Sequence, residues 1–249
     1  MRNTGFGLLL AVCLSVTGCA LPAAKNLSEK DRMVTNGRRA VVIVAQPEIV
    51  ANIHVSKLGN HLGLIGAIID GGVNQNRQKW VESTVKSARE AVPGADIDAM
   101  IMAQFQDSTS STDYLSLRET VLTKNIGEAD LNRLMDESGA DQILFWNVDY
   151  AFGTNFSDIR FSGLASIFNR KSDVRSGRTL LRNALYYRRF NHSERLDNPS
   201  TSDDDVVEAD SNVAQWAADQ GALTRAALKR GFKRITDLFA ADMRTQFQP

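Results

Sequence analysis

The chain has 249 residues, of which 43% are hydrophobic and 23% charged, and its 29 basic side chains equal its 29 acidic ones in number. These proportions are ordinary for a soluble globular protein, and the length suffices for one domain with a substantial core. The balanced charge argues against a nucleic-acid-binding protein, because such proteins usually carry a clear basic excess.

The N-terminus has the layout of a secretory signal peptide over residues 1–18. Arg2 gives a positive start, and an apolar run over residues 5–14 follows it. This run is too short for a membrane-spanning helix, which takes about 20 apolar residues. The segment ends in Val16-Thr17-Gly18-Cys19, where two small residues precede a cysteine.

The motif Val16-Thr17-Gly18-Cys19 resembles the lipobox of bacterial lipoproteins, and the resemblance covers residues 1–22. It implies cleavage before Cys19 and acylation of that residue. Ala20 stands where an aspartate usually marks retention in the inner membrane, so the resemblance implies an outer-membrane lipoprotein that faces the periplasm. Two or more acyl chains form a stable anchor, since each buried CH₂ contributes roughly 0.8 kcal/mol. The alternative is an ordinary signal peptide with a chance cysteine.

The rest of the chain divides into a polar stretch and a domain. Residues 19–38 contain the anchored cysteine and many polar residues, which predict a tether between membrane and domain. Residues 39–249 predict a single periplasmic domain, because no composition break or internal repeat divides them.

The N-terminal half of the domain predicts one buried strand, three helices and a weaker strand. The β-branched run Arg39–Ala45 is typical of a buried strand. Apolar residues recur at helical spacing in Gln75–Val92, Ala95–Gln106 and Glu128–Ser138, and Gly139 is placed to end the last helix. Alternating apolar residues predict the weaker strand: Leu115, Leu117 and Val121.

The C-terminal half predicts an antiparallel meander and then a long helix. In Gln142–Phe152, Asn147 and Asp149 lie on one face, and the other face is shared by Leu144, Trp146, Val148, Tyr150 and Phe152. Alternation returns over residues 159–167 and in Leu180–Phe190, which completes the meander.

After an acidic loop, Ser211 is the predicted N-cap of a helix whose apolar stripe, including Leu223, would cover the meander. The whole pattern predicts an α/β or α+β fold. It has one mixed sheet with a C-terminal antiparallel meander, helices packed on the sheet and a long C-terminal helix.

A glycine-rich segment, Leu58–Val73, has small residues at intervals of four: Gly59, Gly63, Ala67 and Gly71. On a helix this spacing aligns the small residues in one stripe and permits close helix approach. The stripe predicts either an interface between copies or with the membrane, or tight internal packing on the sheet. A dinucleotide loop is excluded, since no Gly-x-Gly-x-x-Gly follows a strand here.

A basic stretch near the end of the meander is a second possible interaction site, formed by Arg182, Arg188 and Arg189 among others. It could contact anionic headgroups or a phosphate-bearing envelope polymer. The alternative is a solvated surface whose charge the following acidic loop partly neutralises.

Catalytic and cofactor motifs are missing from the sequence. The three histidines, His54, His61 and His192, have no second ligand at the spacing of a metal site, and no Gly-x-Ser-x-Gly elbow occurs. The sequence therefore predicts no enzyme activity, no metal and no cofactor.

These observations predict a non-catalytic, lipid-anchored envelope protein that binds a protein partner or assists assembly on the periplasmic side of the outer membrane. Two alternatives remain open: a homo-oligomeric ring or pore component of a secretion system, and a hydrolase with dispersed catalytic residues.

Overall fold

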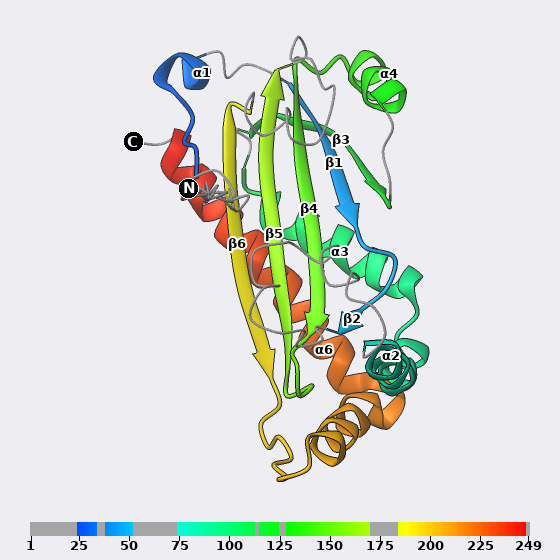
Figure 1. The fold of residues 1–249 in the computed structure, drawn as a ribbon. Helices are drawn as coiled ribbons and strands as arrows, with labels where there is room; N and C mark the ends of the chain where they lie inside the picture. The colour runs from blue at the N-terminus through cyan, green and yellow to red at the C-terminus, as the bar shows by residue number, and fades with distance from the viewer. Residues whose placement is uncertain are drawn as a thin grey trace, which may run out of the picture.

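A mixed six-stranded sheet forms the centre of the protein, with strand order β3-β1-β4-β5-β6 and the short β2 paired to β4 (Figure 1). The computed structural model describes residues 24–33, 38–51, 74–112, 115–124, 128–169 and 184–247. The strands are β1 Arg39–Ala45, β2 Val50–Ala51, β3 Leu117–Thr123, β4 Gln142–Phe152, β5 Asp158–Asn169 and β6 Tyr186–Arg195. The helices are α1 Glu29–Met33, α2 Asn74–Ala91, α3 Gly94–Thr109, α4 Glu128–Ser138 and α6 Asp205–Phe247.

The first half of the sheet is parallel and buried on both faces. β1 pairs in parallel with β3 on one side and with β4 on the other. Val41 and Ile43 pack into the larger core cluster, while Ala40 and Val42 pack into a second cluster on the opposite face. This double burial explains why β1 is a continuous apolar run rather than an alternating one.

The second half is the predicted antiparallel meander, in which β4 pairs with β5 and β5 with β6 in continuous register. The mixed sheet, its antiparallel C-terminal strands and the long C-terminal helix are confirmed. The third strand of the meander was predicted with the wrong end, because β6 continues past Phe190 to Arg195. Its last five residues are polar or charged, so the apolar alternation that marks a strand stops before the strand does. Residues 180–183 lie outside the described part of the chain.

Helices α2, α3 and α6 cover one face of the sheet, as Figure 1 shows. Trp146 of β4 is 1% exposed at the centre of this layer. Its ring lies 6.3 Å from Phe105 of α3, 5.2 Å from Phe239 of α6 and 6.1 Å from Phe190 of β6, measured between centroids. The predicted inward orientation of Trp146 is therefore confirmed.

The long helix begins earlier than predicted. Asp204 caps it, because its Oδ1 accepts the backbone N–H groups of Val206 at 2.9 Å and Val207 at 3.3 Å. Ser211 lies inside α6, so its prediction as the N-cap is wrong. A carboxylate at the start of a helix both caps the free N–H groups and interacts favourably with the helix dipole.

A break divides α6 into two segments. Asp219, Gln220 and Gly221 have positive φ angles of 50°, 56° and 74°. A side chain at Gly221 would place its Cβ 2.9 Å from the Cβ of Ala91, so glycine also allows α2 to approach. Leu223 follows the break and is 39% exposed, which corrects its prediction as a core residue. The change of direction takes it out of the helical phase on which that prediction rested.

Among the described helices, α4 alone packs on the opposite face of the sheet, at one end (Figure 1). Leu134 and Met135 of α4 pack on Val42 and its neighbours, as their spacing predicts. Gly139 ends the helix with a φ of 61°, and the N–H of Ala140 donates to the Met135 carbonyl. The predicted glycine cap is confirmed.

Part of the polar N-terminal stretch lies on the domain. Lys25 pairs with Tyr187 of β6 through two backbone hydrogen bonds of 2.8 and 3.0 Å. Leu27 is 2% exposed within the larger core cluster, and Ser28 caps α1 by accepting the N–H of Asp31. Among the described helices, none combines the length and apolarity that a bilayer crossing requires.

Candidate functional site

The strands of the meander have a polar face that no described helix covers. It lies on β4, β5 and β6 beyond α4, on the side of the sheet opposite Trp146 and Tyr150. We call it the open face. Strand alternation and register place these residues on it: Asn147, Asp149, Ala151, Arg160, Ser162, Leu164, Arg189, Asn191, Ser193 and Arg195.

A shallow hollow of about 700 Å³ lies over this part of the sheet. Asp149 of β4 faces Ser162 of β5, which in turn faces Asn191 of β6, so three polar residues form a row across it. Arg160 and Arg195 also contribute to its lining. The hollow thus presents hydrogen-bonding groups of both charge signs on a rigid antiparallel scaffold.

Two groups in this row are largely buried and have no partner among the described residues. Burial raises the pKa of the Asp149 carboxyl above its ordinary 3.8, while the positive charge of Arg189 acts in the opposite direction. Among the described residues, the Asp149 carboxylate has no hydrogen-bond or ion-pair partner. The Ser162 hydroxyl is buried and has no hydrogen-bond partner in the part of the chain that the structure describes. Such groups cost stability unless something else satisfies them.

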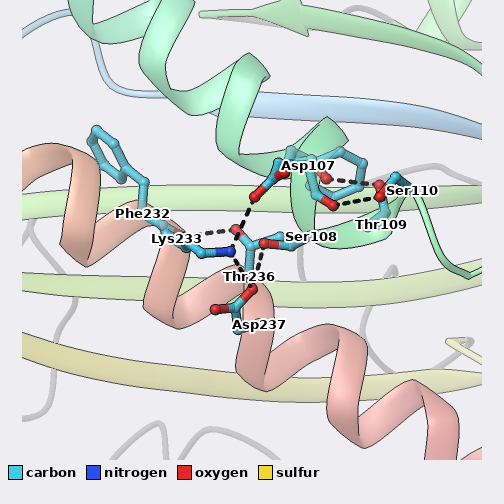
Figure 2. Close-up of polar contacts among 9 residues, drawn as sticks. Asp107, Ser108, Thr109, Ser110, Phe232, Lys233, Thr236 and Asp237 are labelled. Atoms are coloured by element: carbon cyan, nitrogen blue, oxygen red, sulfur yellow. Dashed lines mark hydrogen bonds and ion pairs between the residues drawn. The ribbon is translucent and has the colours of Figure 1, made fainter.

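A second polar cluster lies between α3 and α6 (Figure 2). Lys233 Nζ lies 3.0 Å from Asp107 Oδ2 and 3.3 Å from Asp237 Oδ1, and Ser108 donates to Asp237 at 2.6 Å. The two carboxylates raise the pKa of Lys233. A lysine that acts as a base needs a lowered pKa instead, so we interpret this cluster as a clamp between two helices.

Arg39 of β1 is a buried charged residue outside both of these polar regions. Its side chain is 0% exposed, and Nη1 donates to the Leu115 carbonyl at 2.7 Å. Nε and Nη2 have no hydrogen-bond partner among the described residues, and the guanidinium lies 5.3 Å from the Phe247 ring centroid. Burial lowers the pKa of Arg39 to about 10. Its described contacts are a main-chain carbonyl and an aromatic ring, so we interpret Arg39 as a structural group.

The predicted interaction residues are placed as follows. Cys19, Gly59, Gly63, Ala67, Gly71 and Arg182 lie outside the described residues. Arg188 is on the helix-covered side, where it pairs with Asp242 of α6 and donates to Asn26 at 2.7 Å. Arg189 is exposed on the open face. The structure therefore separates two arginines that are neighbours in the sequence.

The described residues contain no group of three or more histidine, cysteine or acidic side chains that could hold a metal ion. His192 lies 2.7 Å from Glu194, and Glu194 also accepts from Arg230 at 2.8 Å. This contact neutralises a surface carboxylate and brings no nucleophile near the imidazole.

Sequence reasoning placed Asp149 on the solvent side of its strand but did not identify the row that it forms with Ser162 and Asn191. Alternation alone assigns each residue to a face. The register between strands, which joins the three residues, depends on the pairing of β4, β5 and β6.

No known family model and no curated protein matches this sequence. Among solved structures, the chain is similar to a PelC dodecamer from Paraburkholderia phytofirmans, with 10% identity and a TM-score of 0.26. That alignment covers 75% of this chain and 88% of the other. A point variant of PelC from the same organism aligns with 8% identity and a TM-score of 0.25, over 81% and 96% of the two chains. Likeness at this level carries no argument about function.

Proposed function

We propose that this protein is a non-catalytic, lipid-anchored envelope protein that binds a protein partner through its open face. The observation that carries the proposal is the pair of largely buried groups, Asp149 and Ser162, which lies on the open face without a partner among the described residues. A docked partner that donates to the carboxylate and bonds the hydroxyl would offset the cost of keeping them from water.

Charge indicates the kind of partner. Arg160 of the open face is paired with Asp158 at 2.9 Å, but the exposed Arg189 and Arg195 form no ion pair with any described residue. Two described carboxylates lie near them: Asp149, whose pKa the charge of Arg189 lowers, and Asp158, which faces Arg195 in the register but already pairs with Arg160. The outer part of the open face thus favours a partner that is acidic where it meets β6.

The anchor follows from the lipobox resemblance. Acylation of Cys19 would hold the protein at the outer membrane on the periplasmic side. Cys19→Ser should abolish lipidation, because the thiol is the nucleophile that receives the lipid. Mass spectrometry of the mature N-terminus measures this directly, and a free, unmodified Cys19 in the native protein would contradict the anchor.

The binding surface is tested by photo-crosslinking in intact cells. A photoreactive amino acid at Asn191, in the row on the open face, should give a discrete adduct with a partner protein. The matched control is Lys229, which is exposed on the opposite side of the molecule on α6. The same adduct from both positions, or none from Asn191, would contradict docking on the open face.

A closed ring of many copies is the second candidate. The favouring observation is that the sheet ends in two unlike strands, β3 and β6, at opposite edges. Pairing between unlike surfaces generates rings when the rotation closes. Light scattering of the purified full-length protein decides between a monomer and a ring. Gly63→Leu should dissociate a ring that uses the glycine-rich stripe and leave the domain folded.

A further inference from the structure

Half of the backbone hydrogen-bonding groups of β6 point away from the sheet. Tyr187 identifies that half, because its N–H and C=O both bond to Lys25 rather than to β5. Successive residues of a strand direct these groups to opposite sides, so every second residue after Tyr187 also points outward. The N–H of Leu196 confirms the alternation, since it donates inward to Ser157 at 2.9 Å. The outward residues are Arg189, Asn191, Ser193 and Arg195.

Nothing in the described structure occupies this outer edge below the Lys25 bridge. β6 is the last strand of the sheet, and its lower part has no element beyond it in Figure 1. Natural sheets protect such an edge with a bulge, a proline, a covering element or charged side chains, and of these the described part of this edge has the charges of Arg189 and Arg195. The register between β5 and β6 shows no bulge from Tyr186 to Arg195, and β6 contains no proline. The edge is therefore a straight template for an added strand.

The charges along β6 differ between its two sides. Arg188 and Glu194 point toward α6, where Asp242 and Arg230 neutralise them. Arg189 and Arg195 project on the open face, and neither has an ion-pair partner within the described residues. Two unpaired positive charges thus stand near the two ends of the free edge.

These charges disfavour a second copy of the chain on the same edge. Antiparallel pairing of β6 with itself uses all four outward residues only when Arg189 of each copy lies opposite Arg195 of the other. Like charges placed directly opposite in a sheet destabilise the pair. An acidic strand in the same register would instead place a carboxylate against each arginine.

We propose that the free edge of β6 binds an extended acidic segment of a partner protein as an added antiparallel strand. Its carboxylates lie opposite Arg189 and Arg195, six residues apart, and polar or small side chains lie opposite Asn191 and Ser193. The antiparallel direction follows the Lys25–Tyr187 bridge, where this edge already accepts a chain. The inference rests on the proposed function and specifies how that partner is held.

A synthetic peptide tests the backbone pairing. The probe is a fluorescent nine-residue peptide with glutamate at its second and eighth positions and threonine and valine between them. It is titrated by anisotropy against the full-length protein in detergent micelles. Asn191→Pro removes an outward N–H and no bond to β5, so it should weaken peptide binding about tenfold or more, the equivalent of 1.4 kcal/mol. Asn191→Thr keeps the N–H and serves as the matched control.

Charge reversal gives a second test that does not depend on proline. Arg189→Glu combined with Arg195→Glu should abolish binding of the glutamate peptide and create binding of the same peptide with lysines. Equal binding by wild type and Asn191→Pro, or no binding of the lysine peptide by the reversed protein, would overturn the inference. Light scattering tests whether a second copy of the chain occupies the edge instead. A wild-type dimer or ring that Asn191→Pro dissociates would also overturn the inference.

The two proposals can fail separately. If the Asn191 photo-crosslink persists when the edge is blocked by Ser193→Pro, the partner docks on the open face without adding a strand. That result contradicts the inference and leaves the proposed function intact. Loss of the crosslink both in Ser193→Pro and in a variant of the open face such as Ser162→Leu supports the proposed function and the inference together.

Discussion

The two faces of β4 show how differently one strand can be used. Trp146 is enclosed by aromatic rings from α3, α6 and β6, and Tyr150 donates its hydroxyl to the Gln46 carbonyl at 3.2 Å. Their sequence neighbours Asn147 and Asp149 lie on the open face. Neither has a hydrogen-bond partner for its side chain among the described residues. The helix-covered face of β4 is filled by packed aromatic rings, whereas its open face carries polar groups that have no partner among the described residues.

Arg188 and Arg189 repeat the contrast on β6. Arg188 is held between Asp242 and Asn26, while Arg189 extends from the open face. A residue on the helix side should therefore matter for stability, and its neighbour on the open face should matter for binding. Each prediction below compares the two faces.

The largest effect is expected from Trp146→Ala. Removing this buried ring should lower the free energy of unfolding by about 3–5 kcal/mol, since the surrounding rings cannot close the cavity. Asn147→Ala, on the opposite face of the same strand, should change it by no more than about 0.5 kcal/mol. Urea unfolding followed by circular dichroism measures both, and equal losses would show that the faces are assigned incorrectly.

Gly163 tests how tightly the helix-covered face is filled. A Cβ at this position would lie 2.3 Å from the Trp146 ring, so Gly163→Ala should cost about 1–3 kcal/mol through overpacking. Trp146→Phe introduced with it should recover part of the loss, because the smaller ring leaves room. Strictly additive losses in this double-mutant cycle would contradict the close contact.

The neighbouring residues Arg188 and Arg189 give the next comparison, with an expected loss of stability similar to that at Gly163 or smaller. Asp242 is 10% exposed at its side chain and accepts from both Arg188 and the Tyr186 hydroxyl, the latter at 2.6 Å. Asp242→Ala should lower the free energy of unfolding by about 1–3 kcal/mol, because both donors lose a charged acceptor. Arg189→Gln should leave the thermal midpoint unchanged, and a comparable loss there would remove the distinction between the two arginines.

The smallest effect is expected at Asp149, and its sign depends on pH. Burial raises the pKa of this carboxyl in the folded state, so the folded protein favours the protonated form. The stability it contributes is present below the ordinary pKa of 3.8 and is lost as pH rises through the folded-state value. Asp149→Asn should therefore raise the melting temperature at pH 7, and the gain should disappear in acid. A lower melting temperature at pH 7 would contradict the desolvation of Asp149.

The sequence predicts most of the sheet because its strands have unambiguous alternation. Every second residue from Leu144 to Phe152 is apolar and faces the helices, and Ala40–Ala45 is apolar throughout because both its faces are buried. The end of β6 escapes the same reasoning, since an edge strand whose outer residues are polar has no apolar pattern. The break in α6 escapes it too: Gly221 suggests local weakening, but Asp219 and Gln220 take left-handed angles only through their tertiary setting.

The candidate site was less accessible to sequence reasoning. Faces follow from alternation, but Asp149, Ser162 and Asn191 come from three strands and meet only through register. The absence of a partner for Arg189, against the pairing of Arg188, depends on where α6 crosses the sheet. Both features are set by tertiary packing rather than by local pattern.

Amide hydrogen exchange along β6, resolved by residue with NMR, tests the free edge and its use most directly. In the protein alone, the amides of Arg189, Asn191 and Ser193 should exchange rapidly, while those of Arg188, Phe190 and His192 are protected by β5. Addition of the acidic peptide should slow the first set and leave the second unchanged. Uniform protection of β6 before the peptide is added, or exchange that the peptide does not alter, would contradict the account.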